Sequence, residues 1–229
     1  MGKYTRFLSV LAVVVATTFG ASSAASARVF GDVTLGAGGT WPQGSFAAYG
    51  DPGPQGMLRV TVQIPQIRTL MGWWDATFTH FSTETTPVEI EYLGRTFPAD
   101  QNTSQDCLAF HLGLQVGNHT RRGFFRPHAG LGMGLYFFFT DVSLKEVRIG
   151  GEDEEVFSSD VTDSQELLGW RGQIGSDFFF TPKWGLTFDL LYDHVWNLNR
   201  KEGDTRERQT SRFQGFTVGV VVPFGTMAQ

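Results

Sequence analysis

The sequence predicts an all-β fold: a transmembrane, antiparallel, up-and-down barrel of eight strands with long extracellular loops and short periplasmic turns. Three observations predict it. The chain opens with a segment typical of an export signal, eight later segments alternate between apolar and polar residues, and long and short connections alternate between those segments. A strand sends successive side chains to opposite faces, and in a membrane barrel one of these faces meets lipid.

Residues 1–27 have the three parts of a secretory signal peptide. Lys3 and Arg6 precede an apolar run from Leu8 to Ala16, and the segment closes on small residues at Ala27. We expect cleavage after Ala27, which leaves residues 28–229 as the barrel domain. A retained helical anchor is the alternative, but the apolar run is too short to cross a bilayer.

The composition restricts the classes of partner. The formal net charge is −5, and loss of the signal peptide, which carries two positive and no negative charges, makes it −7. Such an acidic exported chain argues against nucleic acid as a partner. Cys107 is the one cysteine, so no internal disulfide forms. After the signal peptide the sequence contains no run of 18 apolar residues, so no membrane-spanning helix is predicted.

The first four alternating segments each place large apolar side chains on one face. They cover residues 29–41, 58–64, 70–78 and 108–116. A soluble sandwich would alternate in the same way, because its apolar faces pack together. Their opposite faces carry, in order, Asp32, Arg59, Asp75 and His111.

The last four segments repeat the pattern over residues 128–139, 168–180, 186–193 and 216–224. In the first of these, Gly130, Gly132 and Gly134 recur at every second position. A phosphate loop would need a different glycine spacing and a following helix. We expect these glycines to leave one wall bare for opposing side chains, such as arginines, in a narrow barrel.

The connections favour the barrel over the sandwich. Long polar connections at 42–56, 82–106, 141–166 and 197–213 alternate with three short ones. Long extracellular loops and short periplasmic turns are typical of outer-membrane barrels, which places both termini in the periplasm. Residues 88–97 leave the strand count open, because they could pair as an extra hairpin.

Aromatic residues gather near the expected strand ends, as in the girdles at the two membrane interfaces. One expected girdle lies toward the loops and the other toward the turns. The first contains Trp41, Phe78, Phe139, Trp170 and Trp196, and the second contains Phe178, Phe180, Trp184 and Phe224.

Six polar residues are expected to point into the barrel and form the candidate site. They would make either a conduit or a plug. The plug is favoured because the interior of eight strands is just wide enough to be filled by side chains, and buried charges must pair. No residue is assigned a catalytic, cofactor-binding or metal-binding role. The six are Arg59, Asp75, His111, Arg171, Asp189 and Asp193.

Over residues 28–224 the chain resembles the small outer-membrane barrels of the OmpA transmembrane, OmpX and OmpW type. The stretches "PHAGLGMGLYF" and "PKWGLTFDLLYDHVW" are similar to strands of that superfamily. The resemblance implies three partners: outer-membrane lipid, lipopolysaccharide and, during biogenesis, the barrel-assembly machinery. Because the chain continues past Phe224 with "GTMAQ", that machinery would read an internal "VVVPF".

The resemblance also frames the function. The expected protein is a monomeric, non-enzymatic outer-membrane barrel with a structural or surface-interaction role. The alternative is a narrow channel for small or hydrophobic solutes. A lipid A-modifying enzyme is the third possibility, but "HVWN" at His194 has tryptophan where the resembling deacylases carry serine. His194 is therefore interpreted as an interfacial residue.

Overall fold

The computed structural model describes residues 30–48, 51–64, 67, 69–92, 95–117, 124–145, 160–196 and 210–225. The expected signal peptide and the last four residues lie outside this part of the chain. Eight strands and one short 3-10 helix make up the described structure. They are β1 (Phe30–Gln43), η2 (Gly44–Ala48), β2 (Gly53–Gln63), β3 (Leu70–Tyr92), β4 (Arg95–Gly117), β5 (Phe125–Lys145), β6 (Asp160–Thr181), β7 (Trp184–Trp196) and β8 (Thr210–Gly225).

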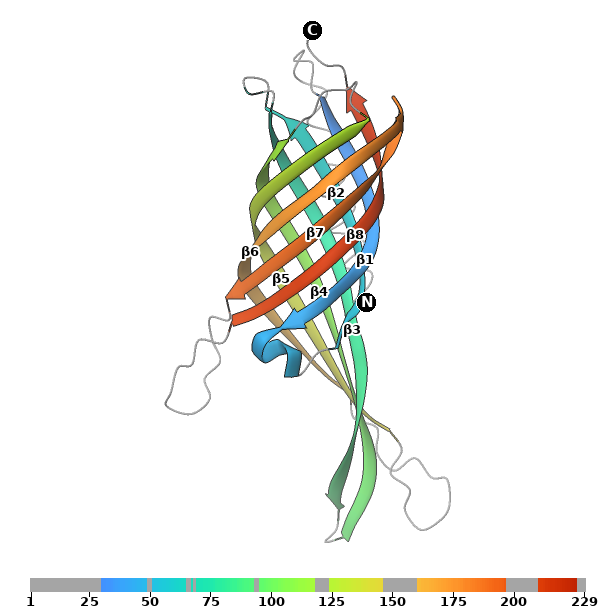
Figure 1. The fold of residues 1–229 in the computed structure, drawn as a ribbon. Helices are drawn as coiled ribbons and strands as arrows, with labels where there is room; N and C mark the ends of the chain where they lie inside the picture. The colour runs from blue at the N-terminus through green and yellow to red at the C-terminus, as the bar shows by residue number, and fades with distance from the viewer. Residues whose placement is uncertain are drawn as a thin grey trace.

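The eight strands form one closed barrel (Figure 1). Each strand pairs antiparallel with the next along the chain, and β1 pairs with β8 to close the sheet. The predicted fold class and strand count are therefore confirmed. Closure leaves no free strand edge within the barrel, which satisfies backbone groups where water is excluded. Among the described residues, no helix is long and apolar enough to cross a membrane.

The strand pairing fixes the shape of the barrel. Starting at Asp32 on β1, we follow the paired residue on each successive strand once around the sheet. The path returns to β1 at Pro42. The path has moved ten residues along β1, so the shear number is 10. With eight strands this corresponds to a tilt of about 40° from the barrel axis and an interior narrow enough for side chains to fill.

The two ends of the barrel differ. At the end called here the hairpin end, β3 and β4 continue beyond the wall as a long ribbon (Figure 1). At the opposite end, called the turn end, β6 and β7 are joined by a turn between Thr181 and Trp184. The chain enters β1 and leaves β8 at this same turn end, where Phe30 pairs with Gly225.

The ribbon corrects two details of the sequence interpretation. Residues 82–106 were expected as a loop, but most of them extend β3 and β4. Val88 pairs with Ala99, so residues 88–97 lengthen two existing strands and add no new ones. Much of the expected connection 141–166 likewise belongs to β5 and β6 where it is described. Apolar alternation did not indicate these strand extensions, because strands outside the apolar band need no apolar face.

The outer surface carries an apolar band. Leu131 is 62% exposed and Leu112 is 70% exposed, although both lie in the middle of strands. Such exposure is unfavourable in water and natural against lipid. Further exposed apolar side chains of this band are Leu35, Ile174, Leu190 and Val218.

Aromatic tiers border the band as predicted. At the turn end Phe124 packs against Phe178 and Phe180, and Phe180 against Trp184. At the hairpin end, Trp170 lies ten residues from Phe180 on β6. At about 3.3 Å per residue and a tilt of about 40°, this separation is about 25 Å along the axis. That matches the height of the apolar band in outer-membrane barrels.

The glycines of β5 face the lumen, but their opposing side chains differ from the expectation. A Cβ on Gly132 would lie 2.6 Å from Trp73 Cζ2 and 2.8 Å from the Leu112 backbone oxygen. A Cβ on Gly134 would meet the ring of His111. The bare wall therefore makes room for a tryptophan and a histidine, and the predicted role for arginines at this wall was wrong.

Candidate functional site

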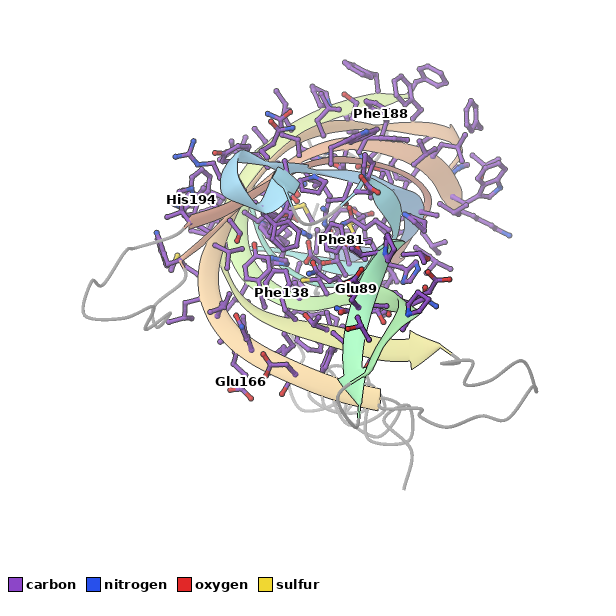
Figure 2. All side chains as sticks on the ribbon, turned by 90° about the horizontal axis from the view of Figure 1, so that it is seen from below. Phe81, Glu89, Phe138, Glu166, Phe188 and His194 are labelled. Atoms are coloured by element: carbon purple, nitrogen blue, oxygen red, sulfur yellow. The ribbon has the colours of Figure 1, made fainter. Side chains whose placement is uncertain are left out.

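The lumen is the candidate site, and it is filled in successive layers along the axis. The layer nearest the hairpin end is apolar. Phe46 of η2 turns into the mouth and packs edge-on against Phe81 and Phe213, with ring centroids 5.3 and 5.1 Å apart. Figure 2, which looks along the barrel from below, shows Phe81 and Phe138 inside the wall. We call Phe46 and the aromatic rings it contacts the aromatic cap. Phe46 packs against a buried apolar cluster formed by Phe81, Cys107, Ala109, Tyr136, Phe138, Leu167, Val195 and Phe213.

Below the aromatic cap, Arg171 joins three strands. Its Nε and Nη2 donate to both oxygens of Asp193 at 2.7 and 2.9 Å. Its Nη1 donates to Asp75 of β3 at 3.2 Å. His111 Nδ1 lies 2.6 Å from the same carboxylate, and Tyr136 donates to Asp193 at 2.7 Å. The Asp75 side chain is completely shielded from solvent. This network crosses the barrel from β6 and β7 to β3 and β4.

A second bridge spans the barrel nearer the turn end. Arg59 of β2 donates through Nη1 to Asp189 of β7 at 2.9 Å. His128 of β5 approaches the other oxygen of Asp189 through Nε2 at 2.7 Å. The Asp189 side chain is also fully shielded from solvent. The Asp189 carboxylate on β7 thus connects β7 to β2 and β5, which lie on other sides of the lumen.

A third layer lies at the turn end. Arg126 of β5 reaches both Asp177 of β6 and Asp32 of β1 through Nη2, at 3.2 Å in each case. The guanidinium also stacks over the ring of Phe179 at 3.9 Å. Because β5 and β1 lie opposite each other in an eight-stranded barrel, this arginine spans the full lumen.

Opposite charges are paired inside the barrel. Among the described residues, five aspartates, three arginines and two histidines are buried within the barrel. The arginines offset three of the five negative charges, and His111 and His128 each lie within 4.0 Å of two of these aspartates. Such pairing is required because an isolated buried charge is costly.

The six predicted lumen residues all lie in the lumen, and the structure brings them together. Arg171 contacts Asp75 and Asp193, His111 contacts Asp75, and Arg59 contacts Asp189. Their facing was predictable from the two-residue period of each strand.

Sequence reasoning missed a set of equally buried partners. Arg126 lies before the predicted segment 128–139, because β5 begins at Phe125. His128 lies inside that segment and shares the face of Gly130, so the same two-residue period places both side chains on the lumen face. Asp32 was predicted on the polar face, but its partner Arg126, which it shares with Asp177, was not.

The acidic and imidazole groups of the lumen are engaged with one another and with arginines. Within the described strands, no group of three or more His, Cys, Asp or Glu side chains is arranged to hold a metal ion. The lumen carboxylates are engaged by guanidinium and imidazole groups. Such an arrangement can hold opposite walls of the barrel together.

His194 lies on the outside of the wall (Figure 2). Its ring stacks on Trp170 at a centroid distance of 5.7 Å and lies edge-on to Trp196 at 6.2 Å. These contacts agree with the interpretation of His194 as an interfacial residue.

A closed barrel with an apolar outer band, aromatic tiers and a packed polar lumen defines an integral β-barrel protein of the outer membrane. The chain belongs to the outer membrane protein beta-barrel domain family, which matches residues 10–224.

The chain is similar to solved outer-membrane proteins at low sequence identity, and the first of these shares its fold. A major outer membrane protein from Thermus thermophilus is 14% identical, with a TM-score of 0.55 over 86% of this chain and 99% of that one. Neisserial surface protein A is 16% identical, with a TM-score of 0.47 over 85% and 97%. The outer membrane enzyme PagL is 16% identical, with a TM-score of 0.38 over 84% and 99%. No curated protein matches the sequence significantly. Identities this low show the fold alone.

Proposed function

We propose that this protein is a non-conducting, non-enzymatic barrel that anchors the β3–β4 ribbon at the outer-membrane surface, with a structural or interaction role. The observation that carries the proposal is the side-chain plug. Arg126, Arg171 and Arg59 each connect different walls of the barrel, at three heights. The aromatic cap, with Phe46 at its centre, covers them at the hairpin end.

Single-channel recording in a planar bilayer tests the proposal directly. Purified, refolded protein is expected to give no steady unitary current, because ions would have to displace buried ion pairs and the cap. Barrel folding is checked by the mobility shift of the unheated sample on a denaturing gel. Steady openings from folded protein would overturn the plugged-barrel proposal.

A narrow channel is the second candidate, and one observation favours it. Within the described residues, several shielded polar atoms on the turn side lack a hydrogen-bond partner: Asp32 Oδ1, His128 Nδ1, Trp73 Nε1 and Gln173 Oε1. Buried polar atoms of this kind are commonly satisfied by internal water. A hydrated lower lumen would conduct only after the Arg171 layer and the aromatic cap had both opened.

The absence of enzymatic activity is part of the proposal. His80 and Asp106 form an outward pair, with Nδ1 and Oδ1 2.6 Å apart. Among the described residues, no hydroxyl or thiol is bonded to the other ring nitrogen, which a nucleophilic mechanism would require. Mass spectrometry of lipid A from cells with and without the protein is expected to give identical spectra. Loss of an acyl chain on expression would contradict this.

We further propose that residues 1–27 direct export, that the barrel-assembly machinery inserts the protein as a monomer, and that both termini face the periplasm. The shared location of the β1 start and the β8 end, opposite the ribbon, supports this orientation. Thr96 on the ribbon is exposed, and the native Cys107 is buried. A Thr96→Cys variant should therefore react with a membrane-impermeant maleimide on intact cells. Labelling only after the outer membrane is permeabilised would reverse the orientation.

A further inference from the structure

Two outward-facing histidines at the hairpin end have opposite surroundings. His80 on β3 is paired with Asp106 on β4. His194 on β7 stacks on Trp170 and lies opposite Arg212 of β8 in the strand register. Within the described structure, neither His194 nor Arg212 has a carboxylate partner. Within the described residues, one side of the rim holds the His80–Asp106 contact, whereas on the other side the Arg212 guanidinium has no carboxylate partner.

The strand register aligns the cationic side. Trp170 of β6 pairs with His194 of β7, which pairs with Arg212 of β8. All three face outward, because their neighbours Arg171, Asp193 and Phe213 are buried in the lumen. Arg212 is exposed and His194 is partly exposed, so both are accessible from outside the wall. Trp196 flanks His194 on the side toward the hairpin end.

The height of this row corresponds to lipid headgroups. Trp170 marks the edge of the apolar band, about 25 Å from the turn-end tier. The shear displaces rows of paired residues toward the hairpin end. The height of a row along the barrel axis therefore rises by about 3 Å from β6 to β7 and again from β7 to β8. His194 therefore lies just outside the hydrocarbon boundary and Arg212 slightly farther out. Tryptophan at this level and cations just beyond it suit an interface with phosphate headgroups.

We propose that Arg212 and His194 form a binding site for a phosphate group of an outer-leaflet lipid of the lipopolysaccharide class. The guanidinium fork matches phosphate oxygens in a two-point contact. His194 supplies a second nitrogen donor, and its ring is positioned by stacking on Trp170. The inference rests on the proposed orientation, in which the hairpin end faces outward.

The occupant is a lipid because of where the site lies. The row borders the apolar band on one side, so a bound phosphate would lie beside the acyl chains of its own molecule. Free phosphate would lack the apolar part of the contact. On the opposite rim, Asp106 occupies His80 and would repel an anion. The site is therefore confined to the β6–β8 side of the barrel.

Native mass spectrometry of the full, folded barrel tests the site. The protein is incubated in detergent micelles with diphosphorylated lipid A or with an acyl-matched analogue that lacks phosphate, and retained lipid is counted. Wild type should retain the phosphorylated lipid roughly tenfold better, and Arg212→Gln and His194→Gln should each lose most of this difference. Arg212→Lys should keep part of it as a point charge.

Lys183→Gln is the matched control, because Lys183 is an exposed cation in the turn at the opposite end. It should retain lipid as wild type does, and added inorganic phosphate should not displace the lipid. Equal retention of both lipids, no loss in Arg212→Gln, or an equal loss in Lys183→Gln would overturn the site. Gel mobility confirms that each variant is folded. The conductance measurement is independent of lipid retention. A negative result for lipid retention would not contradict the plugged barrel, and a conducting barrel would not contradict the lipid site.

Discussion

Arg171 and Asp193 are joined by two parallel hydrogen bonds, 2.7 and 2.9 Å long, inside the lumen of the barrel. The two residues lie directly opposite each other on β6 and β7. The remaining guanidinium nitrogen donates to Asp75 on the far wall. A pair formed between neighbouring strands is thereby extended across the barrel, and one arginine serves two shielded carboxylates.

Loss of Arg171 should be costly for this reason. Arg171→Met removes the charge and keeps much of the volume, which leaves Asp75 and Asp193 with reduced compensation. The free energy of unfolding should fall by about 3–5 kcal/mol. Urea unfolding in lipid vesicles, followed by tryptophan fluorescence, measures this. Adding Asp193→Asn to the variant should recover part of the loss, whereas additive losses in the double variant would show that the pair is not coupled.

Substitution of Gly132 tests the packing of the bare wall. In Gly132→Ala the new methyl group meets Trp73 and the backbone oxygen of Leu112, so overpacking of about 1–3 kcal/mol is expected. Gly72→Ala is the matched control, because nothing lies within 4 Å of a Cβ at that outward position. The same unfolding measurement should separate the two variants. Equal stability would mean that Trp73 does not fill this wall.

A charge on the apolar band tests the membrane face. Leu131 lies near mid-barrel and is 62% exposed, so Leu131→Arg should destabilise the barrel in vesicles by about 2–4 kcal/mol. Thr96→Arg on the ribbon is also an exposed position but lies outside the apolar band, and it should be nearly neutral. If both variants were neutral in vesicles, the surface around Leu131 would not be in contact with lipid.

The aromatic cap should protect the thiol beneath it. Cys107 is buried in the cluster that Phe46 covers. Phe46→Ala should speed the reaction of Cys107 with a small water-soluble maleimide several-fold, while Lys183→Gln leaves the rate unchanged. The cap variant should still give no conductance, because the Arg171 layer below it is intact. Rapid labelling of folded wild type would show that the mouth is already open.

The alternation of the sequence determined a large part of this structure. The period of two assigned a face to Arg59, Asp75 and His111, because a strand has only two faces and lipid excludes charge from one of them. Together with the alternation of long and short connections, this period predicted the eight-stranded barrel, and the aromatic residues near the strand ends predicted its tiers. These features depend on local geometry and on the solvent at each face, and both are encoded in the local sequence.

The tertiary structure decided which side chains meet. Arg126 and Asp32 are far apart in the sequence, and the opposed positions of β5 and β1 bring them into contact. The sequence likewise left open that Trp73 fills the wall beside Gly132 and that the polar residues near Val88 extend two strands. The physical reason is that barrel closure and shear set which residues face each other across the lumen, and no local period encodes that distance.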